Sequence, residues 1–308
     1  MMSMREASDT PVTRRGLMRG GFSLSMILSI VCSLTAGMAG GLWAATMPGP
    51  PTQAASASTD DAEMVYIPEG DFLRGHDEGF DTRPARRISL PAFFIDTYEV
   101  TNKRYKRFVD ATGHKVPWSP DPAAEAYPWP SDPAARAYTW DWHTRTYAEG
   151  KGENPVVLVG WEDAAAFCAW AGKALPTEAE WEKAARGTSG KIYPWGNVWD
   201  PRRANTLESG LRATTPVGAV EGDVSEYGVH DLAGNVSEWV QDWLTPYPGN
   251  SLVNYDAGQK YKVLRGGSWD YFHSITTGYH RQYALPQSQM TAIGFRCAKP
   301  GGSSGSRP

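Results

Sequence analysis

The side chains best suited to chemistry lie near the C-terminus, in residues 264–298. This stretch begins Leu-Arg-Gly-Gly-Ser-Trp-Asp, whose two glycines suit a close backbone approach or a turn with positive φ, and ends Gly-Phe-Arg-Cys-Ala, which is typical of a buried strand. The candidate pocket residues between these ends are Ser268, Trp269, Asp270, Tyr271, His273, Tyr279, His280 and Arg281. They follow neither a helical nor a strand period, and they carry too many functional groups for a linker. We therefore expect any ligand or reaction to involve this segment.

Two kinds of chemistry are open to these residues. Asp270 with His273 and His280 could form a metal site or an acid–base pair, because imidazole titrates near neutrality and such sets suit Cu(II), zinc or iron. Their spacing matches no recognised metal motif. Arg281 has two interpretations, a structural ion pair or an anchor for a substrate carboxylate. The aromatic side chains of Trp269, Tyr271 and Tyr279 would form apolar walls.

Composition excludes some classes of partner. The chain has 308 residues, a net charge of −4 and a pI near 5.9, and no basic run follows its N-terminal segment, so nucleic acid and anionic membranes are not expected partners. After the N-terminal segment, roughly 250 residues remain, enough for a sizeable core. We expect a monomer whose partner is a protein, a peptide or a small aromatic or carboxylate ligand.

Residues 1–57 are predicted to be a signal peptide and linker. The segment Thr13–Arg19 matches the twin-arginine pattern, and a charge-free apolar run, Gly20–Trp43, follows it. Cleavage after Ala45 or Ala57 would release the protein into the periplasm, without membrane attachment. The alternative is an uncleaved signal that anchors the chain to the inner membrane, since the run is long enough to span a bilayer.

The elements that must position the site can be read from caps and periodicity. Thr101 caps a predicted helix that ends at Gly113, and the capping box Thr177-Glu-Ala-Glu180 opens another that runs through Arg186. Strands are expected over 64–75, as a hairpin turning at Glu69-Gly70, and over 88–98 and 154–160, and a third helix over 161–172. The segment 115–153, with four tryptophans, is predicted to be a long surface loop. Its aromatics either face a substrate or tuck into the domain.

Several motifs in the right order carry a family resemblance. Besides 264–298, they are Lys173–Gly187, Tyr193-Pro-Trp-Gly196 and Asp231–Trp239. With these motifs the chain resembles the formylglycine-generating enzyme family, also called the sulfatase-modifying factor family. The resemblance implies one α+β domain over 58–298, with a variant C-type-lectin fold that is rich in loops. Residues 299–308, with their glycines and serines, are expected to be a disordered tail.

The resemblance also shows what is missing. In the copper-dependent members of the family, two cysteines after the Gly-Gly-Ser motif bind Cu(I). The enzyme then oxidises a substrate cysteine to formylglycine. Counted forward from Gly266, those positions hold Tyr271 and Thr276. Cu(I) selects soft sulfur ligands, so copper is not expected here. The glutamates of Lys173–Gly187 are expected to be cap contacts and solvated helix positions.

The resemblance implies further site residues. A disulfide between Cys168 and Cys297 fits both the family and an exported chain with two cysteines after its leader, and two buried free thiols are the alternative. A structural Ca²⁺ would be held by Asp231 and Glu238 with the carbonyls of Gly234 and Val236. A weaker second calcium site maps to Asn205, Thr206, Ser209 and Leu211, where the family's aspartate is replaced by serine.

Three functions are compatible with these residues. The first is a periplasmic oxidative maturation or accessory factor, for example for a siderophore chromophore or a metalloenzyme. The second is a noncatalytic C-type-lectin-like binding module, because a fold does not determine a function. The third is formylglycine generation on sulfatases, which the missing cysteines argue against.

Overall fold

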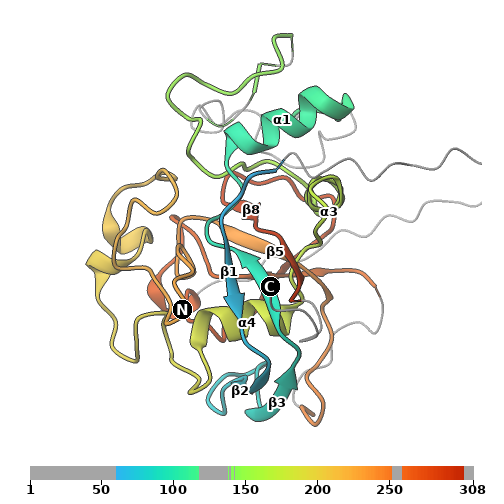
Figure 1. Ribbon diagram of the computed structural model, residues 1–308. Coiled ribbons are helices and arrows are strands. Elements are labelled where there is room, and N and C mark those ends of the chain that lie inside the picture. The colour runs from blue at the N-terminus through green and yellow to red at the C-terminus, as the bar shows by residue number, and fades with distance from the viewer. Residues whose placement is uncertain (1–59, 118–137, 139, 142, 252–258, 302–308) are drawn as a thin grey trace, which may run out of the picture. The chain divides into compact units, whose positions relative to one another are not determined.

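A computed structural model describes residues 60–117, 138, 140, 141, 143–251 and 259–301 (Figure 1). The chain divides into two units, Met1–Gln53 and Ala54–Pro308, and the second unit holds all of the described residues. The twin-arginine segment, the apolar run and both cleavage positions lie outside the described residues. None of the helices within the described residues is long and apolar enough to cross a membrane.

Two small sheets are built from the first third of the domain and its last strand. One joins β1 (Met64–Ile67), β4 (Phe93–Asp96) and β9 (Ala298–Pro300) in the order β1-β4-β9, with both pairs antiparallel. The other is the antiparallel pair β2 (Gly70–Arg74) and β3 (Arg86–Leu90). Because β9 pairs with β4, the last strand is fixed to the fourth, and β9 includes residues 299 and 300, the first two of the expected tail.

The third sheet includes strands from the candidate stretch 264–298. Its order is β7 (Gln282–Ala284), β6 (Lys262–Arg265), β5 (Ser237–Trp243) and β8 (Ile293–Phe295). The pair of β5 and β8 is parallel and the other two pairs are antiparallel. The family signature residues Gly294 and Phe295 thus form a buried strand, as predicted.

Three strand predictions are wrong. The single strand expected over 88–98 is divided between β3 and β4, which belong to different sheets. Residues 64–75 do not form a hairpin, because β1 pairs with β4 while β2 pairs with β3. The change of partner occurs at Gly70, whose φ of 130° turns the chain out of the first sheet. No strand forms over 154–160, where Leu158 has a φ of 61° and only Pro155 makes an isolated bridge, to Thr101.

The helices begin and end where the caps predict. In α1 (Asn102–Thr112) the Thr101 hydroxyl accepts from the N–H of Arg104, and Gly113 ends the helix in the left-handed region. In α4 (Glu178–Arg186) Thr177 and Glu180 form the predicted capping box. The remaining helix, α3 (Trp161–Trp170), packs against α1, and α4 contacts β2, β5 and β6.

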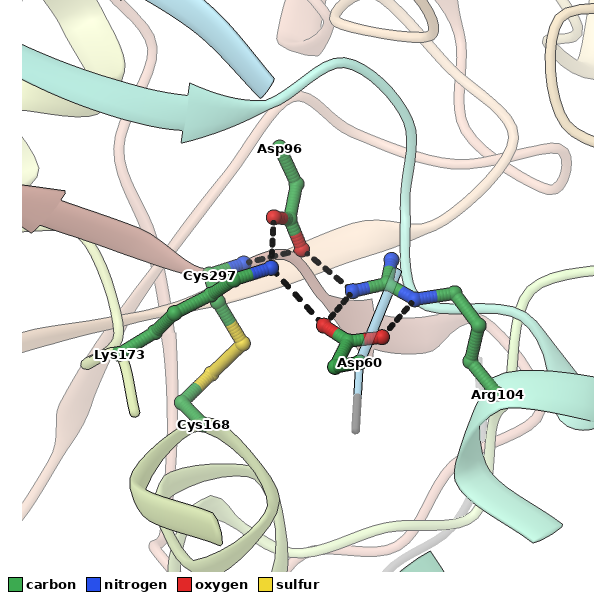
Figure 2. The surroundings of a disulfide bond; sticks show 6 residues. All are labelled: Asp60, Asp96, Arg104, Cys168, Lys173 and Cys297. Carbon is green, nitrogen blue, oxygen red and sulfur yellow. Dashed lines mark hydrogen bonds and ion pairs between the residues drawn. A yellow bond between two sulfur atoms is a disulfide. The ribbon is translucent and has the colours of Figure 1, made fainter. Parts of the chain in front are cut away.

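The disulfide between Cys168 and Cys297 is formed, and both residues are fully buried. An ion network lies beside it, in which Asp60 and Asp96 are each held between Arg104 and Lys173 (Figure 2). Figure 2 shows the two cations approaching the carboxylates from opposite sides. Asp96 also accepts from the backbone N–H of Cys297 at 3.2 Å, which joins the network to the disulfide.

Candidate functional site

The structure divides the candidate pocket residues between two places. Tyr279, His280 and Arg281 lie at a buried ion network on α4, and residues 268–273 lie beside an aromatic cluster formed by the loop 193–199. Gly266 and Gly267 turn the chain between β6 and this segment with φ of 90° and 75°. A Cβ on Gly267 would come within 2.5 Å of the Thr276 side chain, so the predicted close approach is confirmed.

Arg281 forms a buried ion pair with Glu178. Its Nε donates to Oε1 of Glu178 at 2.6 Å and its Nη2 donates to Oε2 at 3.1 Å. Arg74 and Arg265 donate to the same carboxylate, at 3.0 and 3.3 Å. Burial alone would raise the pKa of Glu178, but the charges of Arg281 and Arg265 outweigh it and hold this pKa at about 2. Glu178 is therefore an ionised structural centre.

Glu182, one turn later on α4, extends the network. Its carboxylate accepts from Arg186 at 2.5 Å, from Arg265 at 2.9 Å and from the N–H of Gly75 at 2.6 Å. Both Glu178 and Glu182 are buried, so the prediction of solvated positions is wrong for them. It is right for the cap contact, which Glu180 makes.

Four arginines and an aromatic ring surround these two glutamates. The Tyr247 ring lies under two of the guanidinium groups, with Arg74 at 4.0 Å and Arg281 at 4.4 Å from the ring centroid. These two cations, with Arg186 and Arg265, form ion pairs with Glu178 and Glu182. The Tyr279 ring stacks on His76 at 4.4 Å and lies near Arg186, while burial lowers the pKa of His280. Of the two interpretations of Arg281, the structure supports the ion pair.

The segment 268–270 is held by its neighbours. The Ser268 hydroxyl donates to Asp270 at 2.6 Å, and the N–H of Trp269 donates to the carbonyl of Asn235. The Trp269 ring stacks on Tyr138 with centroids 6.3 Å apart. Asp270 is exposed, and no group of three or more His, Cys, Asp or Glu residues arranged for a metal ion occurs in the described part of the chain.

His273 belongs to the aromatic cluster. Its Nδ1 lies 2.7 Å from Oε1 of Glu208, which also accepts the backbone N–H of His273 at 3.0 Å. Its ring stacks on Trp199 at 4.8 Å. Trp199 lies 5.8 Å from Trp195, which in turn stacks on Tyr193 at 5.2 Å. Burial would raise the pKa of Glu208, but its hydrogen bonds with His273 lower it to about 2.

The two residues that fall on the family's copper-ligand positions when counted forward from Gly266 are close to this cluster. The carbonyl of Tyr271 accepts the N–H of Leu207 at 2.9 Å, next to Glu208. Thr276 is fully buried, and its hydroxyl donates to the carbonyl of His273 at 3.1 Å. Neither residue offers a sulfur ligand, and the two cysteines of the described region are joined to each other. No thiolate is available here for Cu(I).

The main predicted calcium segment is buried and rich in carboxylates. Burial raises the pKa of Asp231 to about 6, and burial together with the charge of Asp231 raises the pKa of Asp223 to about 8. Burial and the charges of Asp231 and Glu238 also raise the pKa of Glu99. The charge of Arg296 offsets part of this effect on all three carboxyl groups. A bound cation would stabilise the ionised form of these buried carboxylates, and their oxygens could coordinate it.

Glu238 fits a calcium ligand less well than Asp231. Its two oxygens accept from Arg296 at 2.7 and 2.8 Å, and Oε2 also accepts from the Trp181 indole at 2.9 Å. The Asp231 carboxylate accepts from the N–H of Gly218 at 2.6 Å through Oδ2. At the second predicted site, Ser209 donates to the carbonyl of Thr206 at 2.7 Å and lies 3.3 Å from Oδ1 of Asn205. Leu211 is exposed there, and its N–H donates to the Ser209 hydroxyl.

Sequence reasoning missed the partners of the α4 glutamates. Arg74 comes from β2, Arg265 from β6 and Tyr247 from the segment after β5, more than sixty residues from Glu178 or Glu182 in each case. The sequence does show several charged residues close together on α4, namely Glu178, Glu182, Lys183 and Arg186. The structure shows that all four are buried, so they must have partners inside the domain. The stacking of His273 on Trp199 had no local signal either.

Comparison with known proteins places this geometry in a family. Residues 50–300 match the sulfatase-modifying factor enzyme 1-like domain. The inactive C-alpha-formylglycine-generating enzyme 2 of Mus musculus is 34% identical over 282 residues, which cover 79% of this chain and 87% of that protein. The formylglycine-generating enzyme of Streptomyces coelicolor is 34% identical over 299 residues, which cover 83% and 93%. The solved structure of PvdO from Pseudomonas aeruginosa is 27% identical, with a TM-score of 0.62, and the match covers 78% and 94%.

Proposed function

Because the chain belongs to the sulfatase-modifying factor family, we propose that it is an exported maturation or accessory factor that does not generate formylglycine with copper. The setting would be the periplasm, and the targets would be of the kind the family resemblance implies, a siderophore chromophore or a metalloenzyme. The site would be the surface around Tyr271 and His273. Its ligand would be a protein, a peptide or a small aromatic or carboxylate-bearing molecule.

One observation carries this proposal. Counted forward from Gly266, Tyr271 and Thr276 fall on the family's copper-ligand positions, and Cys168 and Cys297 are joined in a buried disulfide. A linear Cu(I) site needs two thiolates, and hydroxyl groups do not replace them. The rest of the family frame is intact: the glycine turn, the parallel strand β8 and the capped α4 are all formed. A retained fold with different site residues is compatible with a different function.

The leader sequence and the disulfide support the periplasmic setting. The pair Arg14-Arg15 with the apolar run behind it suits twin-arginine transport, and a disulfide persists in an oxidising compartment. A calcium ion at Asp231, with the carbonyls of Gly234 and Val236, would neutralise part of the buried acid cluster. Its role would be structural.

A noncatalytic binding module is the second candidate. The aromatic surface at Trp195, Trp199 and His273 supports it, because flat apolar rings at a surface bind ligands without any reaction. The mouse relative is named as an inactive enzyme, which is compatible with a noncatalytic binding function.

Two experiments test the proposal. Copper-loaded protein is incubated under oxygen with a Cys-x-Pro-x-Arg peptide, and an aldehyde probe is read, with the Streptomyces coelicolor enzyme as positive control. We expect no aldehyde above the copper-only background, and aldehyde formation well above it would overturn the proposal. In the native host, deletion of the gene should leave an unprocessed metabolite or an immature metalloenzyme that mass spectrometry detects. Identical periplasmic and secreted profiles in mutant and wild type would also contradict it.

Complementation separates the two candidates. Because Arg281 is a structural ion-pair residue, Arg281→Ala tests stability, and Tyr271→Ala is the better probe of the site. If Tyr271→Ala leaves unprocessed material in the host although the target is still bound, the maturation role stands. If it abolishes binding and no unprocessed material accumulates in any strain, the binding module is favoured.

A further inference from the structure

A hollow of about 540 Å³ lies along the loop of residues 195–203, which includes η2 (Pro201–Arg203). Its walls include the indoles of Trp195 and Trp199, and Val198 in the same loop is 79% exposed. The volume is within the range of about 300–1,000 Å³ that small-molecule sites occupy. None of the sequence predictions assigned this hollow.

Both indoles are held in place from behind. Trp195 stacks on Tyr193 with an interplanar angle of 7°, and its Nε1 donates to the carbonyl of Val198 at 2.9 Å. Trp199 stacks on His273 at 20°, and Glu208 fixes that imidazole through Nδ1. Rings that are already immobilised lose little conformational entropy when a flat ligand stacks on them. The two ring planes are 42° apart, so a planar ligand can stack on one indole while its edge contacts the other.

The charge of the hollow comes from Arg203. Arg202 is neutralised by Asp200, to which it donates through Nε at 3.0 Å and Nη2 at 2.8 Å. No carboxylate in the described ranges forms an ion pair with Arg203, whose guanidinium lies 5.7 Å from the Trp195 ring centroid. A Cβ on Gly222 would come within 2.7 Å of the Arg203 Cβ, so the stem of this arginine is closely packed. A guanidinium beside an aromatic wall suits a carboxylate, which it can bind through two hydrogen bonds.

The hollow is connected to the family's site positions. Trp199 stacks on His273, two residues after Tyr271, and the Tyr271 carbonyl accepts the N–H of Leu207. Leu207 begins η3 (Leu207–Ser209), which contacts η2 at the hollow. A ligand stacked on Trp199 would thus border the surface around Tyr271.

We infer that this hollow binds a planar aromatic carboxylate, which stacks on Trp199, contacts Trp195 with its edge and pairs with Arg203. The inference deepens the proposed function by naming a ligand class for its site. A neutral sugar also stacks on indoles, but it leaves Arg203 without a counter-charge. An aliphatic acid satisfies Arg203 but gains nothing from the rings.

The test is isothermal titration calorimetry of the purified, folded domain with 2-naphthoate at low salt. We expect saturable one-site binding, with 2-naphthylmethanol and cyclohexanecarboxylate each weaker by about tenfold, because each lacks one of the two interactions. Arg203→Gln should weaken naphthoate by about tenfold and should leave the affinity for 2-naphthylmethanol unchanged. Trp199→Ala should weaken naphthoate by about three- to tenfold.

Arg202→Gln is the matched control, because it removes an adjacent arginine that is already paired with Asp200, and it should bind naphthoate like the wild type. Circular dichroism melting curves show which variants are folded, and Arg203→Gln keeps the test decisive if Trp199→Ala unfolds. No saturable binding of naphthoate, equal binding of cellobiose, or equal losses in Arg203→Gln and Arg202→Gln would each overturn the inference. If naphthoate fails to bind but the deletion strain still accumulates unprocessed material, only the ligand class is wrong. If naphthoate binds as expected without any deletion phenotype, the maturation function is wrong and the ligand site stands.

Discussion

Arg281 binds the Glu178 carboxylate side-on in the interior of the domain, with one hydrogen bond from Nε and one from Nη2. Removal of one partner from a buried ion pair typically costs about 3–5 kcal/mol, because it leaves an uncompensated charge. We expect Arg281→Ala to lower the free energy of unfolding by an amount in this range, measured by urea denaturation. Arg202→Ala, which removes an exposed pair with Asp200, should leave the urea midpoint unchanged. Equal midpoints for Arg281→Ala and the wild type would contradict the role of the network.

The same carboxylate predicts a pH dependence. The pKa of Glu178 is about 2 in the folded protein, against roughly 4.3 for a glutamate in the unfolded chain. A lowered folded-state pKa contributes stability that is fully present above the unfolded value and is lost as the pH falls towards 2. The free energy of unfolding should therefore decrease between about pH 5 and pH 2. Glu178→Gln should lower stability at neutral pH and flatten this acid slope, and an unchanged slope would show that other groups cause it.

The disulfide predicts a large stability effect. It joins residues 129 positions apart, and closing so long a loop contributes roughly 2–5 kcal/mol. The double variant Cys168→Ala, Cys297→Ala should unfold at a lower urea concentration by a corresponding amount. Peptide mapping of the nonreduced mature protein should recover the two cysteines as one linked peptide pair. Two free thiols in that map would refute the bond.

Calcium binding is best tested at Asp231. Chelator should lower the melting temperature of the wild type, since a cation that binds only the folded state stabilises it. Asp231→Asn keeps an oxygen for the N–H of Gly218 but removes the charge, so it should abolish the response to calcium and chelator. Glu238→Ala is a poorer test, because it also removes the carboxylate that pairs with Arg296. Asp71→Asn, on the surface strand β2, should respond like the wild type. If neither calcium nor chelator changes the melting temperature of the wild type, the site is excluded.

Export is tested at the two arginines of the leader. Changing Arg14 and Arg15 together to lysine should leave the protein in the cytoplasm, detected by fractionation and immunoblotting. Changing Arg5 to lysine, which is outside the motif, should not affect recovery. Normal periplasmic recovery of the double variant would rule out the twin-arginine route.

Local signals in the sequence predicted the helices and the turn well. Thr101 and Thr177 cap helices because their side chains satisfy N–H groups that have no partner within the helix, and this requires only neighbours in sequence. Gly266 and Gly267 marked a close approach for the same kind of local reason. The family motifs predicted the fold and the pairing of Cys168 with Cys297, although these residues are far apart along the chain.

Interactions between distant segments could not be predicted from the sequence. The hydrophobic pattern of 64–75 allows two strands, but it does not state that β1 pairs with β4 while β2 pairs with β3. The burial of Glu178 depends on arginines from two other strands. Likewise, the hollow at Trp195 and Trp199 arises from rings whose rear supports, Tyr193 and His273, are eighty residues apart.

The ion network around Asp96 has a consequence for the order of events in maturation. Lys173 follows Cys168 by five residues and its N–H donates to the Cys168 carbonyl, while Asp96 holds the backbone of Cys297 at both its N–H and its carbonyl. The pair of Lys173 with Asp96 therefore brings the two cysteine-bearing segments together without any covalent bond. A chain exported already folded would reach the oxidising compartment with its thiols side by side. Oxidation would then seal an existing contact, and no search among alternative cysteine pairs would be needed.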